Sequence, residues 1–204
     1  MTKRLKVKLS RQDDSPDYRR KLIIRAYRIK DELTAFKNVL RNPHGADKAV
    51  LKSPWSPDFK WKLHLSLAYW ALVVLRAPTV RQLGPDDKAD LLAIRDRYGK
   101  SSIFTTLRAV ATGVISWADC KKGGMATDDS IKGIMTAIIH VADVIATTPS
   151  QSWGEPFLQW KKEKARGFVI DAAGNMNRPD LLRVWGNTCQ PWLLAGNENN
   201  CRRL

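Results

Sequence analysis

Residues 142–148 read ADVIATT, residues 167–174 read GFVIDAAG and residues 191–198 read PWLLAGNE. Each segment is a short apolar run that ends in small, polar or acidic residues, a pattern typical of a buried strand followed by a turn. The carboxyl ends of parallel strands are where open α/β sheets carry their chemistry. The sequence therefore predicts an α/β fold with a small parallel sheet in residues 142–204.

The preceding region, residues 15–141, has helix-start residues and helical apolar spacing. Ser15-Pro16-Asp17 favours a helix start, and the helix is predicted to end at Asn42-Pro43. Its apolar seam has alternating spacings of four and three and comprises Leu22, Ala26, Ile29, Leu33, Phe36 and Leu40. A helical amino-terminal bundle is thus predicted before the sheet.

Four more helices are predicted in this bundle. Residues 63–75 form the longest apolar run and predict a helix buried on most sides. The next helix ends at Tyr98, and another, starting at Ser101, carries an apolar face that continues to Ala118. Thr127 is expected to cap the last one, whose apolar stripe is Ile131, Ile134, Ile138 and Ala142.

Residues 1–14 leave two interpretations open. Leu5, Val7 and Leu9 alternate with Lys6 and Lys8, which favours a short edge strand with one apolar and one basic face. A flexible basic arm is equally compatible with the same residues.

The order and wording of the three strands resemble the first RecA-like domain of superfamily 1 helicases of the nonsense-decay and replication type. In that family, A-D-V-I-x-x-T precedes motif II, V-I-D-E-A-x-Q, and motif III, G-D-x-x-Q-L-P-P. The resemblance covers about residues 138–204 and implies a partial RecA-like (P-loop NTPase) sheet. It also implies a stalk or inserted subdomain for the helical region. An ordinary α/β domain with three parallel strands remains the alternative.

This chain departs from the family at the catalytic positions. Asp171 keeps the metal-binding carboxylate of motif II, but Ala172 stands where the family has the Glu that orients water. The motif III remnant begins at Gly196 and includes Glu198. The family's Asp and Gln positions hold Asn197 and Asn200, and its Pro-Pro is replaced by Arg202-Arg203.

The P-loop pattern G-x-x-x-x-G-K-S/T is missing from the sequence. Without that backbone cradle and its Lys, no phosphate-binding nest is expected. We therefore expect a non-catalytic, helicase-derived protein without a cofactor. The alternative is a piece of an ATP-dependent DNA or RNA helicase whose P-loop is supplied elsewhere, with Asp171 binding Mg-ATP.

A net charge of +15 indicates a polyanionic partner. Residues 1–50 hold fourteen Lys or Arg against six Asp or Glu. We expect Arg19, Arg20, Arg25 and Arg28 to lie largely off the apolar seam and to bind nucleic acid, DNA or RNA, or an acidic protein. A solvated basic face with no partner is the alternative.

Two other places are candidates for nucleic-acid contact. Lys161 and Lys162 belong to a basic run between Trp160 and Phe168, whose rings are expected to stack on bases. The alternative is a basic run that faces water and binds nothing. Thr147 and Thr148 follow the first strand, and the resemblance implies that this loop touches the nucleic-acid backbone.

The remaining expectations concern environment and assembly. The three Cys and three His have no zinc spacing, which favours a reducing compartment, cytoplasm or nucleus, and no metal site. Residues 63–75 are too short for a membrane span of about 20 residues. The resemblance implies that residues 192–195 form an exposed sheet edge, covered by residues 5–9 or by self-association.

Overall fold

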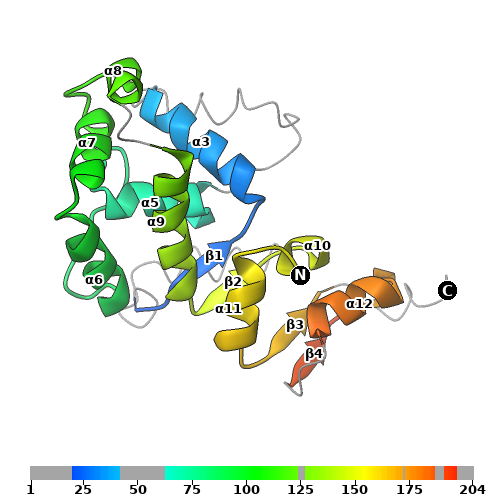
Figure 1. Ribbon diagram of the computed structural model, residues 1–204. Helices are drawn as coiled ribbons and strands as arrows, with labels where there is room; N and C mark the ends of the chain where they lie inside the picture. Colours follow the sequence, from blue (N-terminus) through cyan, green and yellow to red (C-terminus); the bar gives the residue numbers. More distant parts are fainter. Residues whose placement is uncertain (1–19, 42–62, 124–126, 172, 187–190, 197–204) are drawn as a thin grey trace. The chain divides into compact units, whose positions relative to one another are not determined.

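The computed structural model describes residues 20–41, 63–123, 127–171, 173–186 and 191–196 of the 204-residue chain. These residues form mostly helices, together with two small parallel sheets (Figure 1). The chain divides into two compact units, residues 1–146 and residues 147–204. The fold class is α/β and helix-rich, as the sequence predicts.

The core of the first unit is built around helix α5 (Leu67–Val74). The Ser66 side chain accepts a hydrogen bond from the Tyr69 N–H and so caps the helix start. Seven of the eight residues of α5 are buried, which confirms the helix predicted for this apolar run. It is preceded by a short 3-10 turn, η2 (Leu63–Leu65), so the regular helix begins later than the apolar run.

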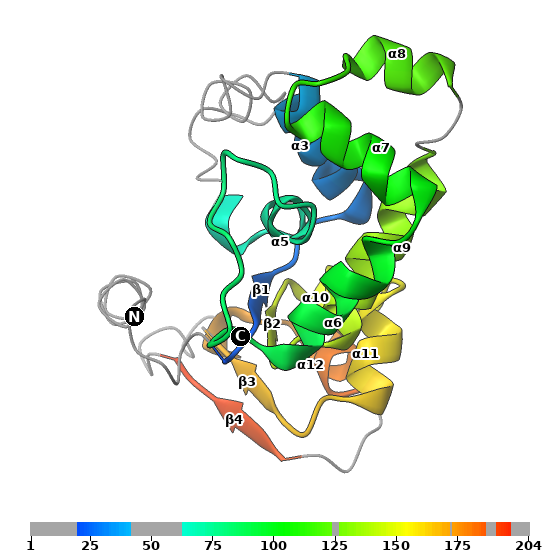
Figure 2. The same ribbon diagram turned by 90° about the vertical axis from the view of Figure 1, so that its left-hand side faces the viewer.

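Three further helices cover α5. Helices α3 (Ile29–Arg41) and α9 (Asp128–His140) pack against it and against each other, and α6 (Ala89–Tyr98) contacts α5 and α9 (Figure 2, where α5 is seen nearly end-on). The predicted α9 stripe is confirmed, because Ile131, Ile134 and Ile138 are buried. No described helix is long and apolar enough to cross a membrane.

The predicted first helix is wrong over its amino-terminal part. Strand β1 (Ile23–Arg25) replaces it there and pairs in parallel with β2 (Val144–Ala146). Leu22, Ile24 and Ala26 are buried, so the buried positions repeat every second residue, as in a strand. The partner strand, 121 positions away in sequence, outweighs the local helical spacing.

The predicted helix from Ser101 to Ala118 is two helices, α7 (Ser102–Ala111) and α8 (Trp117–Lys122). Gly113 between them has φ = +76°, a backbone conformation that ends a helix. The Ser116 side chain then accepts the Asp119 N–H and starts α8.

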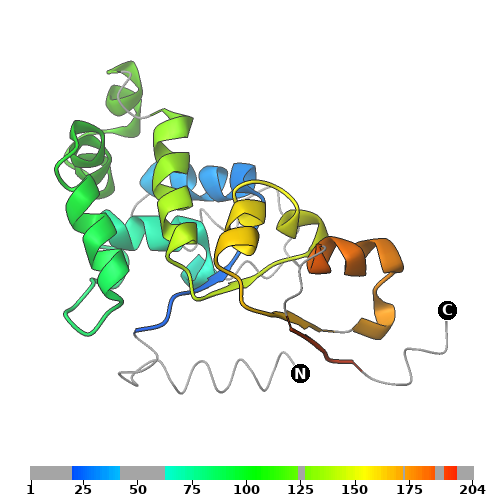
Figure 3. The ribbon, with the colours of Figure 1, turned by 60° about the horizontal axis from the view of Figure 1, so that its bottom comes forward.

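The described residues of the second unit form three α-helices and one strand pair. Helices α10 (Pro149–Ser152), α11 (Phe157–Glu163) and α12 (Arg178–Trp185) accompany strands β3 (Phe168–Ile170) and β4 (Trp192–Leu194), with a 3-10 turn η3 (Ala173–Asn175) after β3 (Figure 3). The two strands are parallel. Gly167 lets the two strands approach closely, because a Cβ there would lie 3.0 Å from the Pro191 carbonyl oxygen, a tight contact.

The three predicted strands occur where the sequence places them, but they do not form one sheet. Strand β2 pairs with β1 in one two-stranded sheet, and β3 pairs with β4 in another. None of the three is buried throughout as predicted, since every residue of β4 is exposed and Ile170 is the one buried residue of β3. The expected division at residues 141/142 lies five residues later, between Ala146 and Thr147, because β2 belongs to the first unit.

Candidate nucleic-acid interface

Five exposed cations lie on the short segment that runs through β1 into α3. They are Arg20, Lys21, Arg25, Arg28 and Lys30, called here the 20–30 basic surface. The strand periodicity produces it, because Leu22, Ile24 and Ala26 face the core while Lys21 and Arg25 alternate with them. Arg19, also predicted as a contact, lies outside the described residues.

Asp143 fixes the start of this segment. Its carboxylate accepts the Leu22 N–H at 2.7 Å and lies 2.8 Å from the Lys88 ammonium. The Leu22 carbonyl in turn accepts the Asp143 N–H at 2.9 Å. These contacts join the entrances of β1 and β2 and hold the backbone next to Arg20 and Lys21.

Glu32 fixes the other end of the segment. Its side chain is fully buried and accepts N–H groups from Tyr27 at 3.3 Å and from Ala68 at 2.9 Å. It thereby ties the turn between β1 and α3 to the amino end of α5. Burial raises the pKa of Glu32 to about 7, although the backbone N–H donors act in the opposite direction.

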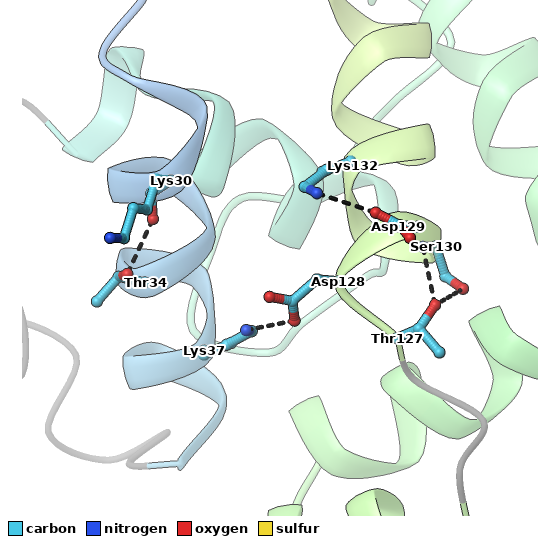
Figure 4. A network of polar contacts seen from close by, with 8 residues as sticks. All are labelled: Lys30, Thr34, Lys37, Thr127, Asp128, Asp129, Ser130 and Lys132. Atoms are coloured by element: carbon cyan, nitrogen blue, oxygen red, sulfur yellow. Dashed lines mark hydrogen bonds and ion pairs between the residues drawn. The ribbon is translucent and has the colours of Figure 1, made fainter.

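In the part of the chain that the structure describes, no ion pair neutralises the 20–30 basic surface, although Arg28 and Lys30 lie close enough to Asp31 to interact with its charge. Among the described residues, none of the five lies within 4.0 Å of a carboxylate oxygen. Arg25 instead lies over the Tyr27 ring at 5.3 Å. Figure 4 shows the contrast: Lys37 pairs with Asp128 and Lys132 pairs with Asp129, whereas the Lys30 amine makes no such contact.

Other cations of the first unit, unlike those of the 20–30 basic surface, have acidic partners. Arg81 bonds Asp87 at 2.8 Å, and that carboxylate also accepts the Gly84 N–H. Lys88 is committed to Asp143. A cation with an acidic partner loses that partner's attraction when it binds a phosphate, so the unpaired group is the better phosphate ligand.

Lys161, one of the predicted contacts, is not exposed. Its side chain is buried, and its ammonium donates to the Arg183 carbonyl at 2.7 Å and lies over the Trp153 ring at 4.9 Å. Burial lowers the pKa of Lys161, and neighbouring Lys162 lowers it further. Lys162 itself is exposed and stays a candidate.

The other predicted residues have different positions. Thr148 caps α10 by accepting the Gln151 N–H at 3.4 Å, and Thr147 is exposed next to it. Asp171 is exposed directly after β3, and Gly196 is exposed after β4. Ala172, Glu198, Asn197, Asn200 and Arg202 lie outside the described residues. The described residues contain no group of three acidic, His or Cys side chains able to hold a metal ion.

Sequence reasoning missed Glu32 and Asp143, the two carboxylates that position the 20–30 basic surface. An acidic residue in the first turn of a helix, as Glu32 is, usually indicates only a favourable helix dipole. Both residues become recognisable once β1 is known to pair with β2.

Comparisons with models of protein families, with curated proteins and with solved structures gave no match to this chain.

Proposed function

We propose that the chain is a non-catalytic protein that binds nucleic acid through the 20–30 basic surface. One observation carries this proposal: eleven consecutive positions hold five exposed cations, and no carboxylate oxygen of the described residues lies within 4.0 Å of them. Phosphate contacts of this kind supply affinity without reading base sequence. The protein is thus expected to bind DNA or RNA of many sequences.

The rigid base of this surface supports the same proposal. Asp143 and Glu32 hold both ends of the segment, and Leu22 and Ile24 are completely buried beneath it. Cations on a fixed backbone lose less conformational entropy on binding than cations on a flexible arm.

The test is a salt titration of binding to labelled duplex DNA, single-stranded DNA and single-stranded RNA. Each phosphate contact contributes about 0.9 to the slope of log affinity against log salt on duplex DNA. Replacing Arg20, Arg25 and Arg28 together by Ser is expected to reduce that slope by about 2 to 3.

A charge-matched control variant tests whether binding depends on the 20–30 basic surface or only on the net charge of the protein. Arg97, Arg108 and Lys121 are exposed in the same unit on α6, α7 and α8. Replacing these three by Ser removes the same charge and is expected to leave the slope within about 1 of wild type. Equal losses in the two triple variants would refute a defined interface. Binding to polyglutamate as tight as to nucleic acid would indicate an acidic protein partner instead.

The helicase-like motifs support a second candidate, an ATP-dependent helicase piece completed by a P-loop from another chain. The observation that favours it is the position of Asp171 immediately after β3, at the carboxyl end of a parallel strand pair. Nucleic-acid-stimulated ATP hydrolysis by the purified chain, lost in Asp171→Asn, would replace the first proposal by this one.

A further inference from the structure

Three tryptophans of the second unit have exposed side chains. Trp153 follows α10, Trp185 ends α12 and Trp192 begins β4, and they are 51%, 37% and 46% exposed. In the described part of the chain these are the exposed aromatic residues, since the other Trp, Tyr and Phe side chains are buried or half-buried. A packed tryptophan buries about 150–250 Å², so three rings left in water indicate a binding surface rather than a core.

A series of contacts brings the three rings to the carboxyl end of α12. The Trp185 and Trp192 rings stack on each other at 5.6 Å, with an interplanar angle of 8°. The Lys161 ammonium lies 4.9 Å from the centre of the Trp153 ring and donates to the Arg183 carbonyl in the last turn of α12. Helix α10 also packs against α11 and α12 (Figure 1). The three tryptophans are called here the tryptophan cluster.

The rings of the cluster are held in place by their neighbours. The buried Lys161 ammonium covers one face of the Trp153 ring, so the exposed part of that side chain includes the opposite face. Trp185 and Trp192 each present one ring face to the other and keep part of their surface in water. Flat rings fixed in this way can stack on a nucleobase, a contact worth about 1–3 kcal/mol per base.

Cations on the same helices can bind the phosphates of a stacked strand. Lys162 adjoins Lys161 on α11 and is exposed. Arg178 is exposed on α12, seven positions before Trp185, and two helical turns place both residues on the same side of that helix. Within the described ranges, neither Lys162 nor Arg178 lies within 4.0 Å of a carboxylate oxygen. Exposed rings beside unpaired cations are the combination that binds single strands.

The cations and the rings together select among the possible ligands. Uncharged sugars also stack on tryptophan, but they gain no attraction from Lys162 and Arg178. A second copy of the chain would bring the same cations to the interface. The bases of a duplex are already stacked on one another, so their faces are not available to the rings, whereas unpaired bases can be splayed onto aromatic side chains.

We propose that the tryptophan cluster stacks on unpaired bases, which makes single-stranded nucleic acid the ligand of the second unit. This inference rests on the proposed function, which supplies nucleic acid as the ligand. It adds a base-stacking site to the phosphate-binding 20–30 basic surface. Stacking is assigned to the second unit because the described aromatic residues of the first unit are buried or half-buried.

The probe is a fluorescently labelled oligothymidylate of about twelve nucleotides, with binding followed by anisotropy at several salt concentrations. Its matched control is an abasic strand of the same length, which keeps the phosphates and sugars but has no base to stack. We expect the abasic strand to bind at least about tenfold more weakly at equal salt, since one stacked base accounts for such a difference.

The protein variants change the rings without changing charge. The double variant Trp153→Leu and Trp192→Leu should bind oligothymidylate at least about tenfold more weakly, with an unchanged slope of log affinity against log salt. Its binding of the abasic strand and of duplex DNA should stay at the wild-type level. The pair Trp153→Phe and Trp192→Phe keeps a ring at each position and should recover most of the binding.

Two further variants keep the test decisive. Trp153→Leu alone leaves the stack of Trp185 on Trp192 in place, so it replaces the double variant if that protein is unfolded by circular dichroism. It should still weaken oligothymidylate binding relative to abasic binding. Trp117→Leu is the control, because Trp117 is half-buried on α8 of the first unit and should not affect stacking.

The outcomes separate this inference from the proposed function. Equal binding of the abasic strand, or wild-type binding by the folded Leu variants, would overturn the inference and leave the 20–30 basic surface standing. Competition by an uncharged glucan oligomer would assign the rings to sugar, and self-association that Trp192→Leu abolishes in sedimentation would assign them to a second copy. If the Leu variants weaken binding while Ser at Arg20, Arg25 and Arg28 leaves the salt slope unchanged, the tryptophan cluster stands and the proposed interface falls.

Discussion

The two units of the chain treat their apolar residues in opposite ways. Among the described residues, the first unit buries thirty hydrophobic residues and exposes two large ones, whereas the second buries three and exposes seven. The apolar segments themselves look alike in sequence. Coverage by other elements makes the difference, since α5 has three helices packed on it, whereas Trp185 of α12 stacks on Trp192 of β4 and leaves that side chain 46% exposed.

The difference implies different sources of stability. Apolar burial contributes about 25 cal/mol per Å² removed from water, and the first unit has most of it. The second unit depends more on individual contacts, such as the Lys161 bond to Arg183 and the stack of Trp185 on Trp192. The following changes test that contrast, from the largest expected effect to the smallest.

The same truncation should have unequal costs in the two units. Leu72→Ala removes a side chain that is 1% exposed, and we expect a loss of about 2–5 kcal/mol in the free energy of unfolding. Leu193→Ala, at a position 62% exposed, should cost less than about 1 kcal/mol. Urea unfolding measures both. Equal costs would show that the second unit has its own buried core.

The first unit should also respond to pH through Glu32. Its pKa is about 7 in the folded protein against an ordinary 4.5, so the folded state binds the extra proton between these values. The stability contributed by this proton is complete below about pH 4.5 and is lost as the pH rises to about 7. The expected loss is about 3 kcal/mol.

Glu32→Gln isolates this effect from other titrating groups. The amide does not titrate, so the difference in unfolding free energy between wild type and variant should change with pH, and the measurement is urea unfolding at several pH values between about 4 and 8. A constant difference across that range would show that the N–H donors of Tyr27 and Ala68 keep the carboxylate charged.

In the second unit, Lys161→Met should loosen α12. The variant loses the charged bond to the Arg183 carbonyl and the contact with Trp153, but it also avoids burying an ammonium. We expect a net loss of about 1–2 kcal/mol, visible as faster amide hydrogen exchange in α12. Lys162→Met, at the adjacent exposed position, should leave that exchange unchanged.

The helices and strand positions that depend on local signals were predictable. Ser101 and Thr127 cap α7 and α9 as expected, and all three predicted strands occur. The pairing was not predictable, because β1 is short and its sequence also fits a helical seam. Only its parallel partner, β2, distinguishes a strand there from the first turns of a helix.

The candidate site shows the same limit. A basic surplus in residues 20–30 is visible in the sequence, and the structure exposes Arg20, Arg25 and Arg28. Lys161 has the same local signal but is buried, because α12 directs a main-chain carbonyl at it. Composition identifies cations, whereas only tertiary packing decides which of them reach solvent.

Gly186 gives the smallest expected effect and tests how α12 ends. It has φ = +61°, and its N–H donates to the Leu182 carbonyl at 2.7 Å. Gly186→Ala should cost about 1 kcal/mol, because a left-handed backbone is unfavourable for a residue with a Cβ. A Cβ there would lie 3.2 Å from the Lys161 amine, a flexible group that can shift.

Gly186→Asn carries the same Cβ but tolerates this backbone conformation, so it should cost less than the Ala variant in thermal melting. Equal costs would assign the effect to crowding of Lys161, and Lys161→Met combined with Gly186→Ala would then recover part of the loss, since the contact with the amine would be gone.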